Sequence, residues 1–552
     1  MPNPPLSRTT TIALALAAAF VACAACRTLS LDFWYDELWS LQHHQLGSLG
    51  ELLTRYPTPN HHVLANAIGY GWLHLLGIHD LEPLLQRPWL ARLPALLCAL
   101  GAAAYTFAAG RLIAGRAGAV WSLALLLTTM PFFHFAGQVR GYALSAGALA
   151  ALMFHGLAYG RRGGRGHAAG ITVAATAALY AIPANLYAVL AVLAGLAAVA
   201  ALGPRARRRH GGRAVLLGGL GGLLALALLA PMLGEIAGNR FVQSEGLWRW
   251  ATLTEIAPQS LAGLLSGRWW LLLLLPVPLL AACVTGRRKP GRAWRRLGSR
   301  GALVVTALTV PFALSFVRGD RPVLRVFVPL APAFALCLGP ALAASLGAVP
   351  RGAWRRGASA AILVALVGGF ALELRQVQQR LRADIAAGVT TQTPSHPYYL
   401  GPWRPDALAA AVAGQRRHEA VFLAECDRVA MPTYLKRHGV TAAPAGELAQ
   451  VLQTRGAAWV ISAWPLRAAR SLRDALDHVR IERRDDGAGF HAAFRLTRAP
   501  GRGAAPKKPR GRGGRPPRST RVGPLSPPIT GPHCHEDHAQ GRRLAGRGPP
   551  RR

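Results

Sequence analysis

Apolar segments long enough to cross a bilayer as helices recur along the chain as far as residue 374. A crossing helix needs roughly 17 to 25 mainly apolar residues. The segments close to this length are 10–30, 93–110, 117–136, 142–160, 168–183, 186–202, 214–233, 269–285, 301–317, 325–348 and 358–374. Hydrophobic residues make up 52% of the chain and charged residues only 16%. The pattern predicts an α-helical polytopic membrane protein with about eleven transmembrane helices.

The basic residues are concentrated in the connections between these segments. Lys and Arg outnumber Asp and Glu by 63 to 24, which gives a net charge of +39. The most basic connections are 110–116, 161–167, 204–213, 286–300 and 350–356. The positive-inside rule places all of them in the cytoplasm when the amino terminus is inside and the chain after residue 374 is outside. Because topology explains these arginines, the charge predicts no specific nucleic-acid partner.

Segment 62–78 is also apolar, but it carries His62, Asn66 and His74. If it crossed the membrane, every later basic connection would face the wrong side. We therefore predict that it lies in the membrane interface, within one long outer loop over residues 31–92. The predicted transmembrane domain covers residues 1–374.

The composition changes after residue 374. Residues 375–415 read as an irregular connection, and residues 416–497 alternate short strand-like runs (AVFLAEC, AAWVISAW, FHAAFRL) with helical patterns. This alternation predicts a small extracytoplasmic α/β domain. Residues 500–552 consist largely of Pro, Gly and Arg with little to bury, so we expect a disordered basic tail.

The first outer loop opens with LDFWYDELWSLQHHQ, residues 31–45, in which Asp36 and Glu37 are adjacent acids. An acid at the bilayer centre costs at least roughly 2.5 kcal/mol, so the pair is expected at the water–lipid boundary. One interpretation is that the acids mark the start of an interfacial helix, with Trp34 and Trp39 as interface anchors. The other is catalytic, because a positioned carboxylate can take a proton from an acceptor hydroxyl or amine.

Five stretches, in order, resemble the motifs of one family. They are YDELWS, PNHHVLANAIGYGWLHLLG, RPWLARLPALLCALGAAAYTFAAGRLIAGRAG, AGQVRGYALSAG and LRVFVPLAPAF. Together they resemble the membrane glycosyltransferases of the GT-C fold, particularly family 39. That group includes the protein mannosyltransferases, the aminoarabinose transferases of lipid A and the lipopolysaccharide galacturonosyltransferases. The resemblance covers roughly residues 10–350.

The resemblance implies a GT-C fold with interfacial helices in the first outer loop. It implies transfer of a sugar, usually with inversion, from a polyprenyl-phosphate donor to an acceptor outside the cytoplasmic membrane. The acceptor would be a glycolipid, a protein or a cell-wall glycan. By the same resemblance, Asp36 is the candidate general base or acceptor anchor, and Glu37 is its neighbour in contact with acceptor or metal.

Four arginines lie in or beside the predicted outer connections: Arg140, Arg318, Arg321 and Arg325. A lipid phosphate already leaves readily, so cations near it matter more than an acid, and these arginines are candidates for binding the donor phosphate. The alternative is an interfacial arginine that reaches toward lipid headgroups.

Other polar side chains come from the matched segments. His61 and His62 lie in the segment that resembles a His-Pro-Pro-Leu motif, and Tyr142 belongs to the Arg-x-Tyr motif, so all three are candidates for acceptor contact. The chain departs from the family pattern in two places. NHHVL lacks the two prolines, and GQVRGY lacks the further acid that many members carry near Arg-x-Tyr, so a second catalytic carboxylate from that region cannot be named.

The same outer loop offers candidate ligands for a divalent metal. His43 and His44 can combine with Glu51 or Glu37, since imidazole and carboxylate are common metal ligands. The alternative is that these histidines form hydrogen bonds at an interface.

A transporter or lipid flippase would also have about eleven spans and a basic inner side. Transporters commonly place charged or broken segments near the bilayer centre in two related halves. Here the predicted spans are nearly free of ionisable residues and no half-repeat is evident. A non-catalytic scaffold would leave the Asp-Glu pair and the ordered arginines unexplained.

Overall fold

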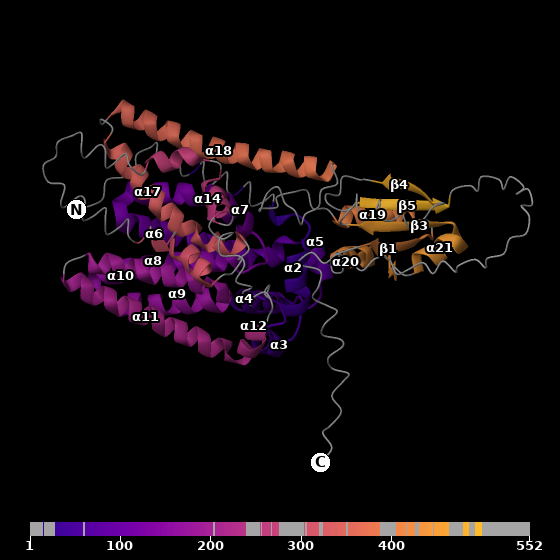
Figure 1. The fold of residues 1–552 in the computed structure, drawn as a ribbon, viewed down its shortest axis with the longest axis horizontal. Coiled ribbons are helices and arrows are strands. Elements are labelled where there is room, and N and C mark those ends of the chain that lie inside the picture. The colour runs from indigo at the N-terminus through magenta and orange to yellow at the C-terminus, as the bar shows by residue number, and fades with distance from the viewer. Residues whose placement is uncertain are drawn as a thin grey trace, which may run out of the picture. The chain divides into compact units, whose positions relative to one another are not determined.

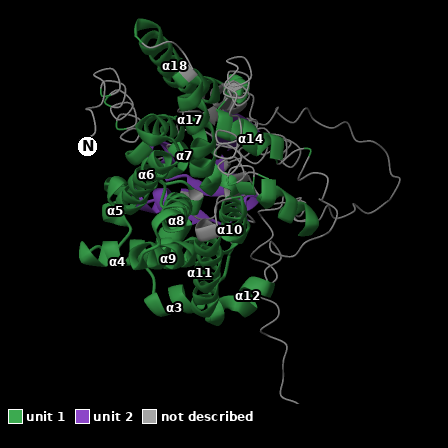
Figure 2. Cartoon of the chain, turned by 90° about the vertical axis from the view of Figure 1, so that its left-hand side faces the viewer, with its two compact units in different colours: residues 1–380, 396–400 green, residues 381–395, 401–552 purple. Residues whose placement is uncertain are grey.

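The computed structural model describes most of residues 28–238, then 257–274, 309–318 and 324–386, and the C-terminal segments 405–424, 430–462, 479–484 and 492–498, with short gaps inside several of these ranges. Most of the predicted spans 10–30 and 269–285 lies outside the described residues, as do the first part of 301–317 and the tail 500–552. The chain divides into two units, residues 1–380 with 396–400, and residues 381–395 with 401–552 (Figure 2).

Long helices dominate the first unit (Figure 1). They are α6 (Trp89–Leu127), α8 (Tyr142–Arg162), α9 (Arg165–Ala181), α10 (Leu186–Ala201), α11 (Arg205–Leu229), α17 (Ala331–Ala348) and α18 (Ala353–Ala386). Within the described residues, six stretches are long and apolar enough to cross a membrane: Trp89–Leu127, Tyr142–Arg162, Pro183–Ala201, Arg208–Gly238, Phe327–Gly347 and Ala353–Val377. The predicted helical membrane architecture is confirmed.

Shorter elements connect these helices or precede them. They are α2 (Tyr35–Ser40), the π-helical turn η1 (Leu41–Gln45), α3 (Leu49–Thr54), α4 (Val63–Leu75), α5 (Glu82–Gln86), α7 (Met130–Ala136), η2 (Pro183–Asn185), η3 (Ala230–Met232), α12 (Leu233–Gly238), α14 (Ala257–Leu265), η5 (Trp269–Leu274) and η6 (Leu324–Leu330). Helix α4 has 13 residues and is therefore about 20 Å long. It is too short to cross a hydrocarbon core of about 30 Å, and the interfacial position of 62–78 stays a prediction.

Helix α6 consists of two helices that meet at a reversal. Ala114 and Gly115 leave the helical conformation, and Gly115 has φ 71° and ψ −160°. A Cβ placed on Gly110 would lie 3.0 Å from Ala119 Cα, whereas nine residues along a straight helix would separate the two by about 13 Å. The two halves therefore pack against each other, with the predicted basic connection 110–116 at their turn.

The prediction of one continuous span over 117–136 is wrong. The helix ends at Leu127, and α7 begins at Met130. The hydroxyls of Thr128 and Thr129 donate back to main-chain oxygens of the preceding turn, and Pro131 follows without an N–H to continue the ladder. The break leads the chain into the connection that carries Arg140.

The second unit contains a five-stranded sheet in the order β2-β1-β3-β5-β4. Its strands are β1 (Ala420–Ala424), β2 (Ala442–Ala443), β3 (Ala457–Ser462), β4 (Val479–Arg484) and β5 (Ala492–Arg498), with helices α19 (Pro405–Gln415), α20 (Ala430–Arg437) and α21 (Leu448–Arg455). Strand β1 pairs in parallel with β2 and β3, while β5 runs antiparallel to β3 and β4. The three strand-like runs noted in the sequence form β1, β3 and β5, so the small α/β fold is confirmed. Helix α18, however, continues to Ala386, past the predicted span end at 374.

Small residues allow close packing between α17 and α6. A Cβ on Gly339 of α17 would lie 2.5 Å from the main-chain nitrogen of Ser122 and 2.7 Å from its Cα. Close approach at small residues is a common way for membrane helices to associate. Gly347, in the same helix, has nothing within 4 Å of that position.

We expect Gly339→Ala to destabilise the protein by about 1–3 kcal/mol, because α17 and α6 would have to move apart. Gly347→Ala is the matched control and should be neutral or raise stability by up to about 1 kcal/mol, as alanine favours helix. Thermal unfolding of the two purified variants in detergent measures this difference. Equal midpoints for both variants would contradict the described contact.

Candidate active site

The motif YDELWS forms helix α2 immediately after the first apolar segment. Trp34 is the residue before the helix and is extended, with φ −87° and ψ 167°. Its N–H donates to Glu37 Oε2 at 3.3 Å, and a carboxylate at this third helical position is a common N-terminal cap. Asp36 and Glu37 both lie in the first turn, where acids are favoured by the helix dipole.

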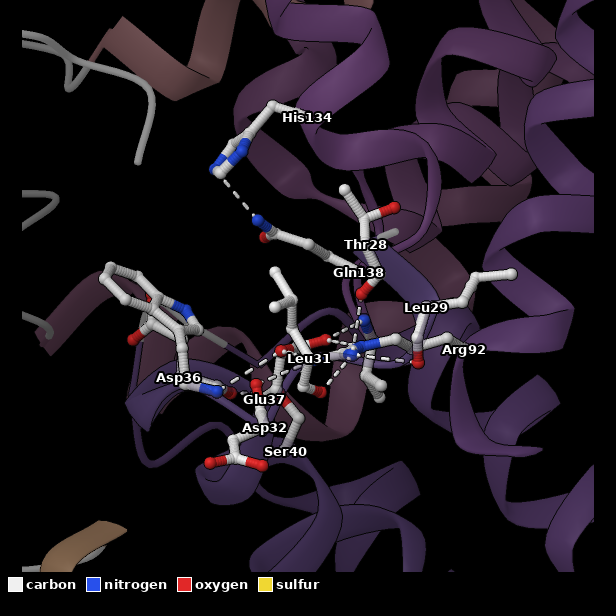
Figure 3. Close-up of polar contacts among 12 residues, drawn as sticks. Thr28, Leu29, Leu31, Asp32, Asp36, Glu37, Ser40, Arg92, His134 and Gln138 are labelled. Atoms are coloured by element: carbon white, nitrogen blue, oxygen red, sulfur yellow. Dashed lines mark hydrogen bonds and ion pairs between the residues drawn. The ribbon is translucent and has the colours of Figure 1, made fainter. Parts of the chain in front are cut away.

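Glu37 is buried and paired with an arginine that the sequence analysis did not assign. Arg92 donates from Nε to Glu37 Oε1 at 2.9 Å and from Nη2 to Oε2 at 2.7 Å (Figure 3). The two side chains are 4% and 3% exposed. Val139 N–H also donates to Glu37 Oε1, at 2.9 Å. Including Trp34, four N–H groups therefore hold this carboxylate.

Arg92 also binds the main chain at the end of the first apolar segment. Nη1 donates to the carbonyl oxygens of Thr28, Leu29 and Leu31 at 2.9, 3.2 and 2.6 Å, and Nη2 donates to Asp32 O at 3.1 Å. The guanidinium thus satisfies carbonyls at the end of a turn, as cations near helix C-termini do. The available signal was the arginine before Pro94 in RPWLARLP, which marks the start of α6.

Asp36 pairs with a different arginine. Arg140 Nη1 lies 3.1 Å from Asp36 Oδ2, and the side chains are 1% and 8% exposed. Arg140 belongs to the connection between α7 and α8, and its guanidinium carbon is 5.6 Å from the ring centre of Tyr142. Asp36, Arg140 and Tyr142 were all candidates from the sequence. They therefore lie close together although Asp36 is about a hundred positions away from the other two.

His62 and Tyr142 lie beside this pair of charges. His62 Nδ1 accepts a hydrogen bond from Gly141 N–H at 2.7 Å, which leaves Nε2 as the protonated nitrogen of a neutral ring. The rings of His62 and Tyr142 meet edge to face with centroids 4.9 Å apart. His62 thus fixes the backbone between Arg140 and Tyr142, and its predicted contact with the acceptor stays a prediction.

His61 belongs to a separate buried network. Its Nε2 donates to Leu52 O at 2.8 Å, and its Nδ1 accepts from the Asn66 amide at 3.1 Å. Asn66 Oδ1 in turn accepts from Gln45 Nε2 at 3.3 Å. The ring of His44 lies 4.0 Å from that of His61. This network links η1, α3 and the start of α4.

Both of these histidines are kept neutral. Burial lowers the pKa of His61 to about 4, although its hydrogen bond to Leu52 works in the opposite direction. Burial also lowers the pKa of His44 to about 3, with smaller contributions from His61, His43 and Arg140. Removal of an imidazolium from water is costly, so the uncharged form prevails at neutral pH.

The predicted metal ligands do not gather into one site. His43 stacks on Trp39 with centroids 3.9 Å apart, His44 packs on His61, and Glu51 is exposed on α3. Over the part of the chain that the structure describes, no group of three or more His, Cys, Asp or Glu side chains could hold a metal ion. The described residues therefore offer no three-ligand site, and the divalent cation stays a prediction.

The other predicted phosphate-binding arginines have different surroundings. Arg318 is exposed, and its Nη1 donates to Tyr187 Oη at 3.2 Å. Arg325 lies in η6, but its side chain is outside the described set, as is the whole of Arg321. Of the four arginines, Arg140 is the one with a described contact to the acid pair.

Comparison with known proteins gives structural matches alone. No protein-family model and no curated protein matches the chain. Its fold is similar to that of ArnT from Cupriavidus metallidurans in the apo state, with 14% identity and a TM-score of 0.47 over 88% of this chain and 98% of that chain. ArnT bound to undecaprenyl phosphate gives 16% identity and a TM-score of 0.47 over 88% and 97%. ArnT belongs to the group of transferases that the motifs resemble.

We expect Arg92→Leu to destabilise the protein by about 3–5 kcal/mol, because Glu37 would remain as a buried charge without its ion partner. The double change Arg92→Leu with Glu37→Gln should recover part of this loss. Arg55→Leu is the control, since Arg55 and Glu235 form an ion pair with side chains 68% and 36% exposed, and removal of an exposed pair should cost at most about 1 kcal/mol. Similar losses in the Arg92 and Arg55 variants, measured by thermal unfolding in detergent, would contradict the described burial.

Stability should fall on mild acidification. The pKa of His61 is about 4 in the folded chain and about 6.5 when unfolded. Between these values the unfolded state binds the extra proton, so folding stability is complete above about pH 6.5 and declines toward pH 4, by up to about 1.4 kcal/mol per pH unit for this group. His61→Gln should flatten the decline, while His79→Gln, at an exposed position, should not. Thermal midpoints across this pH range decide the question, and identical slopes in the wild type and His61→Gln would show the assignment to be wrong.

Proposed function

We propose that this membrane protein is a glycosyltransferase that moves a sugar from a polyprenyl-phosphate donor to an acceptor on the extracytoplasmic side, with the amino terminus inside and the α/β unit outside. The observation that carries the proposal is the buried ion pair between Asp36 and Arg140, 3.1 Å apart. It brings an acid from residues 31–92 together with a guanidinium from the connection between α7 and α8, away from the basic connections. This pairing of groups suits a reaction in which a proton is taken and a phosphate leaves.

Asp36 is the proposed general base. As the acceptor oxygen or nitrogen attacks the anomeric carbon, the Asp36 carboxylate takes its proton. The bond between that carbon and the phosphate oxygen breaks, and the lipid phosphate leaves with the electron pair. A single displacement of this kind inverts the configuration at the anomeric carbon.

Arg140 is the proposed phosphate-binding residue. A guanidinium binds carboxylate and phosphate oxygens with the same planar geometry. We infer that Arg140 holds Asp36 until the donor arrives and then binds the donor phosphate, which exposes the carboxylate to the acceptor. The charge that develops on the leaving phosphate is thereby matched by a fixed cation.

Glu37 has a positioning role in this scheme. Its two oxygens already accept four N–H groups, two of them from Arg92. It holds Val139, one residue before Arg140, and so fixes the distance between Arg140 and Asp36. The transporter alternative has no comparable support, since buried carboxylate–arginine pairs on an outer loop do not form a path through the bilayer.

Asp36→Asn should lower sugar transfer per folded molecule by about 10²- to 10⁴-fold, the usual contribution of general-base catalysis. It should also lower stability, because Arg140 would keep a buried charge without its ion partner. The assay follows label from a radiolabelled polyprenyl-phosphate sugar pool in membranes with matched amounts of protein. Asp80→Asn, an exposed acid of the same loop, is the matched control and should transfer at the wild-type rate.

Glu37→Gln tests whether Glu37 positions other residues or takes part directly in the reaction. Transfer by this variant should fall in proportion to the amount of folded protein, because Glu37 acts through packing. Transfer by Asp36→Asn at the wild-type rate, or wild-type membranes that move no label, would refute the proposed reaction.

A further inference from the structure

The end of the helical bundle away from the acid pair carries a dense group of arginines. It is formed by the reversal in α6, the end of α8, the start of α9 and the start of α11. Figure 1 shows the end of α10 and the start of α11 at one end of the bundle and α2 and α5 at the other. We call the arginines of these segments whose side chains the structure describes the basic end. They are Arg111, Arg116, Arg161, Arg162, Arg165, Arg208, Arg209 and Arg213.

Direct contacts hold these helix ends together. Arg161 donates from Nη2 to Leu112 O, which joins α8 to the α6 reversal. The ring of His210 in α11 would lie 3.3 Å from a Cβ placed on Gly163, at the turn between α8 and α9. It also meets Tyr159 edge to face, with centroids 5.5 Å apart. Arginines from three separate connections therefore share one surface.

The stretch of sequence that forms this surface contains no acid. No Asp or Glu occurs between Glu82 and Glu235, a stretch that includes every arginine of the basic end. Those two acids belong to α5 and α12, which lie away from the start of α11 in Figure 1. All eight arginines except the half-buried Arg116 are exposed. Such an excess of positive charge creates a field that attracts anions from outside the protein.

Exposed apolar residues identify the kind of anion. Leu202, directly after α10, is 56% exposed, and Leu216, three residues after Arg213 in α11, is 74% exposed. The arginines therefore border directly on lipid-facing helix surface, at the depth where headgroups lie. A nucleic acid has no acyl chain that could cover these leucines, whereas a lipid presents phosphate and hydrocarbon together.

We propose that the basic end binds the phosphate headgroups of anionic lipids in the adjoining leaflet. The arginines form charge-assisted hydrogen bonds to phosphate oxygens, while the acyl chains cover the exposed leucines of α10 and α11. This surface is separate from the proposed catalytic residues, so the two proposals stand or fall independently.

The test compares lipid retention by the full-length protein in detergent. Native mass spectrometry counts phosphatidylglycerol and phosphatidylcholine molecules that remain bound after titration with each lipid. The variant is Arg162→Gln with Arg165→Gln and Arg209→Gln, all exposed side chains. The matched control removes the same charge elsewhere through Arg87→Gln, Arg375→Gln and Arg455→Gln, also at exposed positions. Thermal unfolding confirms that both triple variants are folded.

Wild type and control should retain phosphatidylglycerol in preference to phosphatidylcholine. The variant should bind phosphatidylglycerol at least about tenfold more weakly, because each basic residue near an anionic surface contributes roughly fivefold. Equal retention by the variant and wild type would overturn the proposal, as would an equal loss in the control, which would indicate net charge alone. Displacement of the lipid by inorganic phosphate, but not by chloride at the same ionic strength, would identify a site for a free anion and would also overturn it.

Discussion

The buried ion pair between Glu37 and Arg92 is the interaction on which the arrangement of the acid site depends. Through these two side chains, α2, the start of α6, the end of the first apolar segment and the connection before α8 meet. Each buried charge costs several kcal/mol in lost hydration, which is recovered only when all partners are in place. The four segments are therefore constrained to come together as a unit, and Asp36 is brought to Arg140 as a result.

Asp36 and Glu37 have different partners because neighbouring side chains on a helix point in different directions. Successive residues on a helix point about 100° apart, so Asp36 and Glu37 cannot face the same arginine. Glu37 faces Arg92 and the interior of the bundle, while Asp36 faces Arg140 on the connection between α7 and α8. One pair can thus be structural while its neighbour remains available for chemistry. The sequence suggested a shared role because adjacency in the chain carries no information about direction toward distant partners.

Periodic features were predictable from the sequence, and pairings were not. Apolar length located most of the long helices, and strand-like runs located β1, β3 and β5, because both depend on local composition. The break after Leu127 was missed, since a pair of threonines before Pro131 interrupts a segment whose hydropathy is uniform. Arg92 was overlooked for a different reason. Its importance comes from Glu37, 55 positions earlier, and no local pattern encodes that contact.

Arginines at the two ends of the bundle differ in what neutralises them. Arg92 and Arg140 are buried, and each has a carboxylate within hydrogen-bonding distance, so their charge is fixed inside the protein and can be directed at a reacting group. The arginines of the basic end are nearly all exposed and lie in a stretch of chain without a single acid, so their charge is directed outward. The distribution of only a few acids therefore decides which arginines organise the site and which contact the surroundings. A carboxylate introduced among the basic connections would weaken the positive charge that orients the helices in the membrane and the attraction of this surface for anions. This gives a physical reason for the absence of Asp and Glu from residues 83 to 234.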